Sequence, residues 1–222
     1  MGTLFLLEII HMKAHIKICG LTRPRDVEAA LLYGADMLGF IVEAKSSRKL
    51  SVGAAAQISR PARGCASRVA VTVNADEQLL RQICSVMRPS ILQMHGDESP
   101  QWLSEVKTFT GLPIIKAIAV RDHKDLERVK TFENCADYIL LDAKPPKDEA
   151  RRGGHGLAFD WDLLKGFSAK VPVILAGGLT PNNIGAAKAT GLIFFDVSSG
   201  VEATPGIKDH SRIQAFMKAL HD

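Results

Sequence analysis

Aromatic side chains are scarce in this chain of 222 residues, at 6% of the sequence. Proteins that bind single-stranded nucleic acid stack its bases on aromatic rings, and so few rings leave little for such a platform. The net charge is only +4, and no block of five or more basic residues of the kind found in nucleic-acid-binding arms is present. These shortages argue against a nucleic-acid partner, whereas a modest basic excess fits an anionic small molecule.

Long apolar runs are missing as well, since none approaches the roughly 18 residues of a membrane span. The first 14 residues include a short apolar run, but Glu8 interrupts it, no basic residue precedes it and no small-residue cleavage site is evident. We therefore expect residues 1–14 to be an N-terminal extension rather than a signal peptide, and residues 15–222 to form one domain. No membrane contact is expected, and the predicted location is the cytoplasm.

Cysteine is sparse and irregularly spaced. The four residues Cys19, Cys65, Cys84 and Cys135 form no CxxC pair and no zinc-ligand spacing. Without a sign of secretion, paired disulfides are not expected and the thiols are predicted to be reduced. No metal site is expected either.

Eight short apolar runs recur along the chain, and each is followed by a longer segment with helical apolar spacing. The runs are residues 15–19, 37–42, 68–73, 90–95, 113–120, 137–142, 171–178 and 194–200. Repeated strand–helix units indicate parallel strands joined by helical crossovers. Eight units in a chain of this length favour an α/β fold with a single closed (β/α)₈ TIM barrel over an open sheet. No GxGxxG follows the first run, which weakens the case for a dinucleotide-binding fold.

Two of the expected helices have clear start signals, because Ser99-Pro100 and Thr180-Pro181 each place a capping hydroxyl before a proline at the first helical position. The longest polar interruption is residues 143–156, rich in proline, glycine and charge. We expect it to be a mobile loop on one rim of the barrel.

Glycine-bearing turns follow the seventh and eighth expected strands. They contain Gly177-Gly178 and Ser198-Ser199-Gly200, and the first runs directly into an expected helix. Glycines let backbone N–H groups approach an anion, helix N-termini favour negative charge, and these two loops are the usual phosphate site of this fold. In either turn alone the glycines could serve only to make a tight turn, but the two turns together predict a phosphate site.

Four further residues at the C-terminal strand ends carry reactive or charged groups. Asp142 ends an apolar strand, where apolar surroundings would raise its pKa and suit it to be a general acid, although it could equally cap the next turn. Cys19 by itself reads as a packed residue, but a following helix N-terminus would lower its pKa and make it a base or nucleophile. Arg48 could grip a carboxylate bidentately or be a solvated loop residue. His95 could contact substrate or make a structural hydrogen bond.

Six motifs stand in order along residues 15–220: "KICGLT", "GFIVEAKSSRKLS", "QMHGDES", "LLDAKPP" with "GGHGLAFDW", "LAGGLTPNN", and "FDVSSGVE" with "PGIKD". Together they resemble phosphoribosylanthranilate isomerase of tryptophan biosynthesis. The resemblance departs from the family only at Met94, in place of a leucine, and at Thr72, in place of an apolar residue. It says nothing of residues 1–14.

The resemblance implies an Amadori rearrangement of N-(5-phosphoribosyl)anthranilate. Cys19 would be its general base and Asp142 its general acid, while Arg48 would hold the anthranilate carboxylate. The phosphate would lie on Gly177, Gly178, Ser198, Ser199 and Gly200. Proton transfer alone is needed, so neither a metal nor an organic cofactor is implied. The expected partner is a phosphorylated small molecule, and the chain is expected to be a monomer or a homodimer.

Two alternatives remain. The related histidine-pathway ribonucleotide isomerase has similar phosphate loops but uses a pair of aspartates, and Cys19 at the end of the first strand argues against it. A catalytically silent barrel that binds a phosphorylated ligand would be expected to have lost Cys19 or Asp142, and this chain retains both. The remaining cysteines, Cys65, Cys84 and Cys135, lack the rim setting and are interpreted as structural.

Overall fold

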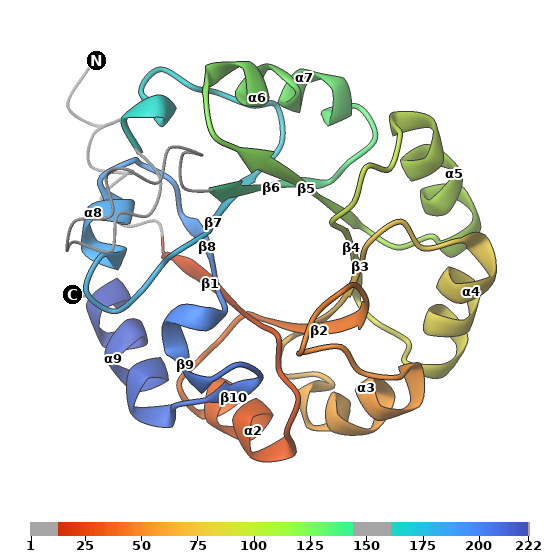
Figure 1. Cartoon of the computed structure of the whole chain (residues 1–222), viewed down its shortest axis with the longest axis horizontal. Helices are drawn as coiled ribbons and strands as arrows, with labels where there is room; N and C mark the ends of the chain where they lie inside the picture. The colour runs from red at the N-terminus through yellow and green to blue at the C-terminus, as the bar shows by residue number, and fades with distance from the viewer. Residues whose placement is uncertain (1–12, 144–160, 222) are drawn as a thin grey trace.

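Eight parallel strands close into a barrel in the order in which they occur along the chain (Figure 1). The computed structural model describes residues 13–143 and 161–221. The strands are β1 (His15–Cys19), β2 (Met37–Glu43), β3 (Ser67–Thr72), β4 (Ile91–Met94), β5 (Ile114–Val120), β6 (Tyr138–Ala143), β7 (Val173–Ala176) and β8 (Phe194–Val197). The closed barrel predicted from the sequence is confirmed.

Helices form an outer ring around the strands (Figure 1). They are α2 (Pro24–Leu32), α3 (Val52–Ile58), α4 (Glu77–Val86), α5 (Pro100–Thr110), α6 (His123–Glu127), α7 (Val129–Phe132), α8 (Ile184–Lys188) and α9 (His210–His221), with the 3₁₀ turns η1 (Arg60–Ala62), η3 (Trp161–Leu164) and η4 (Ser199–Val201). None of the helices in the described part of the chain has the length and apolar character needed to cross a membrane. All four cysteines are free thiols.

One of the two predicted helix starts is confirmed and the other is wrong. The Ser99 hydroxyl accepts the Trp102 N–H at 3.1 Å, and α5 begins at Pro100 as expected. After β7, however, the helix begins at Ile184 and not at Pro181. The Asn183 side chain accepts the Thr180 N–H at 2.7 Å and donates to the Gly178 carbonyl at 2.9 Å. These bonds fold residues 178–183 into a turn, which delays the helix by three residues.

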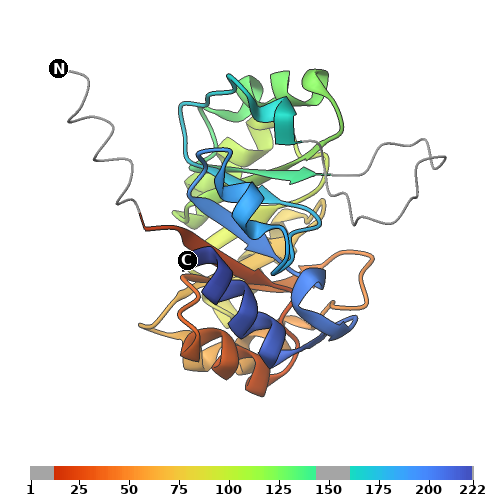
Figure 2. The ribbon, with the colours of Figure 1, turned by 90° about the vertical axis from the view of Figure 1, so that its left-hand side faces the viewer.

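The core has two layers, because alternate residues of each strand face opposite sides. One layer lies between the strands and the helices. The other fills the barrel interior and contains Cys19, Met37, Val69, Val71, Ile91, Ile115, Ala117, Leu140, Ile174 and Ala176. The strands run from left to right in Figure 2, so their C-terminal ends meet at the right-hand rim. Cys19, at the end of β1, therefore stands where the apolar interior meets that rim.

A short antiparallel hairpin follows the last barrel strand and was not predicted from the sequence. It consists of β9 (Glu202–Thr204) and β10 (Ile207–Lys208), and Gly206 turns it with φ 81°. The Lys208 N–H donates to Asp26 of α2 at 3.2 Å, and the ring of His210 lies 2.9 Å from the same carboxylate. The hairpin is thus tied to α2 and α9, and it brings two charged residues, Glu202 and Lys208, back to the rim.

Two sequence expectations fall largely outside the described residues. Residues 1–12 of the expected extension and residues 144–156 of the expected rim loop are not among them. The first strand begins at His15, where the barrel domain was expected to begin.

Candidate active site

All nine residues singled out in the sequence line one pocket of about 380 Å³ at the C-terminal rim. They are Cys19, Arg48, His95, Asp142, Gly177, Gly178, Ser198, Ser199 and Gly200. Seven further residues complete the lining: Ile41, Val71, Gln93, Leu140, Ala176, Leu179 and Asp196. The pocket therefore has an apolar floor, one thiol, two carboxyl groups, one guanidinium and two glycine-bearing loops.

The Cys19 thiol lies at the pocket floor, and 7% of the residue is exposed. The expectation that a following helix lowers its pKa is wrong, since α2 begins only at Pro24 and burial instead raises the pKa of the thiol. The opposing influence comes from inside the barrel. Lys17, two residues earlier on the same strand face, draws the pKa of the thiol down through its positive charge.

Asp142 reaches the pocket from the end of β6 and is less enclosed by apolar groups than the sequence suggested. Its side chain is 24% exposed, and its Oδ2 lies 3.4 Å from Nε2 of His95. The other ring nitrogen of His95, Nδ1, is 3.0 Å from the amide nitrogen of Gln93. With the Gln93 amide N–H₂ donating to Nδ1, the proton of a neutral His95 ring is on Nε2 and faces Asp142. The carboxyl group is therefore oriented by a polar chain, Gln93–His95–Asp142.

Arg48 enters the pocket from the loop after β2, and Glu202 of the hairpin holds it. Its Nε and Nη2 donate to the two oxygens of Glu202 at 2.7 and 2.5 Å. This pairing raises the pKa of the guanidinium, and Arg48 with Lys208 lowers that of Glu202 although burial opposes it. Gly20 makes room for the arginine, because a Cβ there would lie 2.6 Å from Arg48 Cδ. Its φ of 75° also favours glycine.

The two predicted phosphate loops touch each other. Gly177 and Gly178 both have positive φ, at 90° and 67°. A Cβ on Gly200 would lie 1.8 Å from the Leu179 carbonyl oxygen, so the loop after β8 packs directly on the loop after β7. Lys208 donates to the Ser198 carbonyl at 3.0 Å. A buried cation thus supports the wall on which an anion would rest.

Five charged or polar residues at or beside the pocket were missed in the sequence. Lys17, Gln93 and Asp196 each stand inside an apolar strand, in "IKIC", "LQMH" and "FDVSS". A polar residue one or two positions before the rim of such a strand is the signal that could have found them. No sequence feature pointed to Glu202 or Lys208, because the hairpin that returns them to the rim was not expected.

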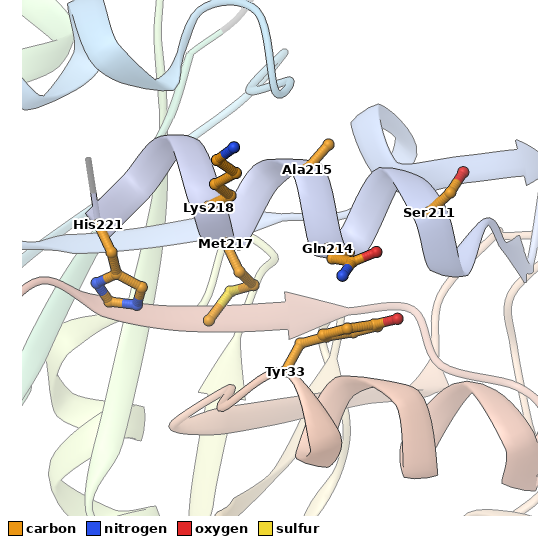
Figure 3. A pocket seen from close by; sticks show the side chains of 7 residues that line it. All are labelled: Tyr33, Ser211, Gln214, Ala215, Met217, Lys218 and His221. Atoms are coloured by element: carbon orange, nitrogen blue, oxygen red, sulfur yellow. The ribbon is translucent and has the colours of Figure 1, made fainter.

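A second, larger hollow of about 560 Å³ lies between α2 and α9 (Figure 3), lined by Tyr33, Ser211, Gln214, Ala215, Met217, Lys218 and His221. It has no carboxylate or thiol and lies on the helices rather than at the strand ends. Within residues 13–143 and 161–221, no three His, Cys, Asp or Glu side chains are grouped so that they could hold a metal ion. Of these two hollows, the one at the rim is lined by a thiol and by carboxylates.

Comparison with known proteins gives one consistent result. A family model described as N-(5'phosphoribosyl)anthranilate (PRA) isomerase matches residues 16–219. The N-(5'-phosphoribosyl)anthranilate isomerase of Agrobacterium fabrum is 44% identical over 215 residues, which are 95% of this chain and 96% of that protein.

Solved structures of the same family share the barrel. Phosphoribosyl anthranilate isomerase in complex with reduced 1-(o-carboxyphenylamino)-1-deoxyribulose 5-phosphate superposes with a TM-score of 0.79 at 31% identity, covering 94% of this chain and 98% of that chain. The Thermotoga maritima enzyme gives a TM-score of 0.82 at 34% identity with the same coverage. Family model, relatives and structures all span nearly the whole chain, which therefore belongs to the N-(5'-phosphoribosyl)anthranilate isomerase family.

Proposed function

We propose that this protein converts N-(5-phosphoribosyl)anthranilate to 1-(2-carboxyphenylamino)-1-deoxyribulose 5-phosphate, a step of L-tryptophan biosynthesis. The observation that carries the proposal is the meeting of a thiol, a carboxyl group, a guanidinium and two glycine-bearing loops in one pocket. The ligand named in the solved relative has a carboxylate at one end and a phosphate at the other. Arg48 and the touching loops after β7 and β8 offer one partner to each anion.

The reaction needs one acid and one base. Asp142 protonates the ring oxygen of the substrate, so that the C1–O bond breaks and the sugar opens to a protonated Schiff base. The Cys19 thiolate then removes the proton from C2, and the electron pair moves to form the enol. The enol loses its hydroxyl proton and gains a proton at C1, which gives the ketone product. No atom is gained or lost overall, as an isomerisation requires.

His95 orients the acid rather than acting on the sugar. Its Nε2–H faces Asp142 Oδ2 at 3.4 Å, so that oxygen is engaged and the other, Oδ1, is the one that can present a proton to the pocket. Gln93 fixes this tautomer through its contact with Nδ1 at 3.0 Å. The geometry favours Asp142 as acid because its carboxyl group is held in one orientation while 24% of the side chain remains exposed.

The test is the loss of substrate fluorescence on addition of purified protein, with no metal or cofactor added. We expect turnover by the unaltered chain. Cys19→Ala and Asp142→Asn should each lower kcat by about 10²–10⁴-fold, the usual contribution of a general acid or base. Absence of turnover in the unaltered protein would overturn the proposed reaction.

Matched variants separate these roles from general damage. Cys65 is an exposed thiol and Asp97 an exposed carboxylate, so Cys65→Ala and Asp97→Asn remove the same groups outside the pocket. Both should turn over like the unaltered protein. Near-normal kcat in Cys19→Ala or in Asp142→Asn would contradict the role assigned to that residue.

A further inference from the structure

At the pocket floor, the barrel interior contains an ion pair that has no part in the proposed reaction. Lys17 Nζ lies 2.9 Å from Asp196 Oδ2, with the two side chains 1% and 9% exposed. The interior of such a barrel is ordinarily filled by branched apolar side chains. Burying two charges there has a desolvation cost that a hydrophobic pair would avoid, so this pair needs a reason beyond stability.

The strand register places this pair directly against the Cys19 thiol. Lys17 of β1 is the Cα partner of Asp196 in β8, and Cys19 is the Cα partner of Gly39 in β2. A Cβ built on Gly39 would lie 2.7 Å from Cys19 Sγ and 3.1 Å from Lys17 Nζ. The missing side chain of Gly39 thus leaves one small space that the thiol and the ammonium share.

One oxygen of the Asp196 carboxylate is buried without a hydrogen-bond partner among the described residues. This oxygen is Oδ1, and it lacks a partner there although Asp196 lines the pocket. A buried acceptor without a partner is costly, so the carboxylate is held in place by Lys17 and not by a surrounding network. Asp196 therefore holds one side of the Lys17 ammonium, and another side faces the Cys19 thiol across the space left by Gly39.

We propose that Lys17 is a positioning residue for the catalytic base, holding the Cys19 thiol at the pocket floor and supplying the positive charge that its thiolate requires, with Asp196 anchoring the ammonium. This inference rests on the proposed function, because it takes Cys19 to be the base. Burial raises the pKa of the thiol, and Lys17 is the largest influence acting in the opposite direction. Burial likewise lowers the pKa of Lys17, but Asp196 and Cys19 together hold it above its ordinary value, so the ammonium stays charged.

Other charged groups also face the thiol. Lys208 of β10 lowers the pKa of the thiol and Asp196 raises it, each less than Lys17 lowers it. Arg48 also interacts with the thiol, but both Arg48 and Lys208 are already paired with Glu202. The charged or titratable groups that act on the thiol or line its pocket are Lys17 (β1), Arg48 (loop after β2), His95 (after β4), Asp142 (β6), Asp196 (β8) and Lys208 (β10). Glu202 (β9) pairs with Arg48 and Lys208.

The experiment measures thiol ionisation without any substrate. The protein is treated with iodoacetamide between about pH 7 and about pH 11, and alkylation of the Cys19 peptide is followed by mass spectrometry. The span extends well above the ordinary thiol pKa of about 8.5 because burial raises the pKa of Cys19. Lys17→Met should move the midpoint of the rate profile to higher pH, and alkylation at a fixed lower pH should slow about tenfold for every pH unit by which the midpoint rises. In turnover, Lys17→Met should lower kcat and leave KM nearly unchanged.

Two further variants show whether a shifted midpoint comes from the Lys17 charge or from damage to the barrel interior. Lys17→Met leaves Asp196 unpaired in the interior, so the double variant Lys17→Met with Asp196→Asn removes both charges and avoids that cost. Its midpoint should also rise, because Lys17 outweighs Asp196 at the thiol. Lys116→Met is the matched control, since Lys116 is as deeply buried as Lys17 but belongs to the layer outside the barrel. It should leave the midpoint unchanged.

The outcomes separate this inference from the proposed function. A midpoint that is the same in the unaltered protein and in the folded Lys17 variants, single or double, overturns the inference. If Cys19→Ala is inactive at the same time, the proposed base still stands. Midpoints that shift as described, together with inactive Cys19→Ala, support both.

Discussion

The guanidinium of Arg48 and the carboxylate of Glu202 lie edge to edge, although 154 positions separate them in the chain. The pair uses two of the five N–H donors of the arginine. The same carboxylate accepts Lys208 Nζ at 2.9 Å, and Lys208 also donates to the Ser198 carbonyl. One buried glutamate therefore connects the residue proposed for the substrate carboxylate with the loop proposed for its phosphate.

Replacing this carboxylate should weaken substrate binding without slowing the chemistry. In Glu202→Gln the amide keeps the shape of the side chain but loses the charge that holds both cations, and hydrogen bonds to charged groups are worth about 1.5–3 kcal/mol. We expect KM for N-(5-phosphoribosyl)anthranilate to rise roughly tenfold or more, with kcat changed less than about twofold. Steady-state fluorescence kinetics give both constants. Glu77→Gln, at an exposed pair with Arg81, is the control and should alter neither. A fall in kcat at unchanged KM would contradict a positioning role for Glu202.

The contact between the loops after β7 and β8, which are proposed to bind the phosphate, predicts a sharp difference between two glycines. Gly200→Ala would place a Cβ against the Leu179 backbone, whereas Gly185 in α8 has no atom within 4 Å of its Cβ position. Overpacking of this kind costs about 1–3 kcal/mol, so Gly200→Ala should raise KM and weaken inhibition by inorganic phosphate roughly tenfold. Gly185→Ala should leave both unchanged and stabilise the helix by about 0.5–1 kcal/mol. Equal phosphate inhibition in the two variants would show that the loops do not bind phosphate.

The barrel and the rim could be predicted from the sequence because both follow from short-range patterns. Eight apolar runs set the strands, and the C-terminal ends of parallel strands share one rim, so Cys19 and Asp142 fall together without any knowledge of contacts. The same reasoning brought Gly177 and Ser198 to that rim. Local patterns suffice where the fold itself brings the residues together.

Partners across the chain could not be predicted in this way. Lys17 and Asp196 are 179 positions apart, and their pairing depends on the register between the first and last strands. The spacing of residues along the sequence does not identify the partner of a charged residue when the two lie on different strands so far apart in the chain. The predicted start of α8 was wrong for a more local reason. The Asn183 side chain closes a turn that competes with the helix signal at Thr180.

The buried pair Lys116–Glu98 predicts a large loss of stability when it is broken. Lys116 Nζ lies 2.6 Å from Glu98 Oε2, both side chains are 1% exposed, and Glu98 also accepts the Asn74 and Gly96 N–H groups of the loops after β3 and β4. Lys116→Met leaves that carboxylate buried without its cation, which should lower the free energy of unfolding by about 3–5 kcal/mol in urea titrations. Combining it with Glu98→Gln should recover part of the loss. A cost below about 1 kcal/mol for Lys116→Met would mean that the pair is not closed in solution.

The fully buried Asp26 predicts how stability depends on pH. Burial alone would raise its pKa, but hydrogen bonds from Arg23, His210 and the Lys208 backbone bring it below the ordinary carboxyl value. A carboxylate whose folded pKa is depressed adds stability that is complete above its unfolded pKa of about 3.9 and is lost as the pH falls through the folded pKa. Asp26→Asn should therefore lower the free energy of unfolding at pH 7 by about 1.5–3 kcal/mol.

That difference should narrow below about pH 4, because protonation then removes the same charge from the unaltered protein. Urea unfolding of both proteins at neutral and at acid pH measures it directly. The other carboxylates titrate in both proteins, so their contributions largely cancel in the comparison. If the difference in the free energy of unfolding between the two proteins stays constant or increases in acid, the charge of Asp26 does not hold α2 to the hairpin and α9. Its role there would then be packing alone.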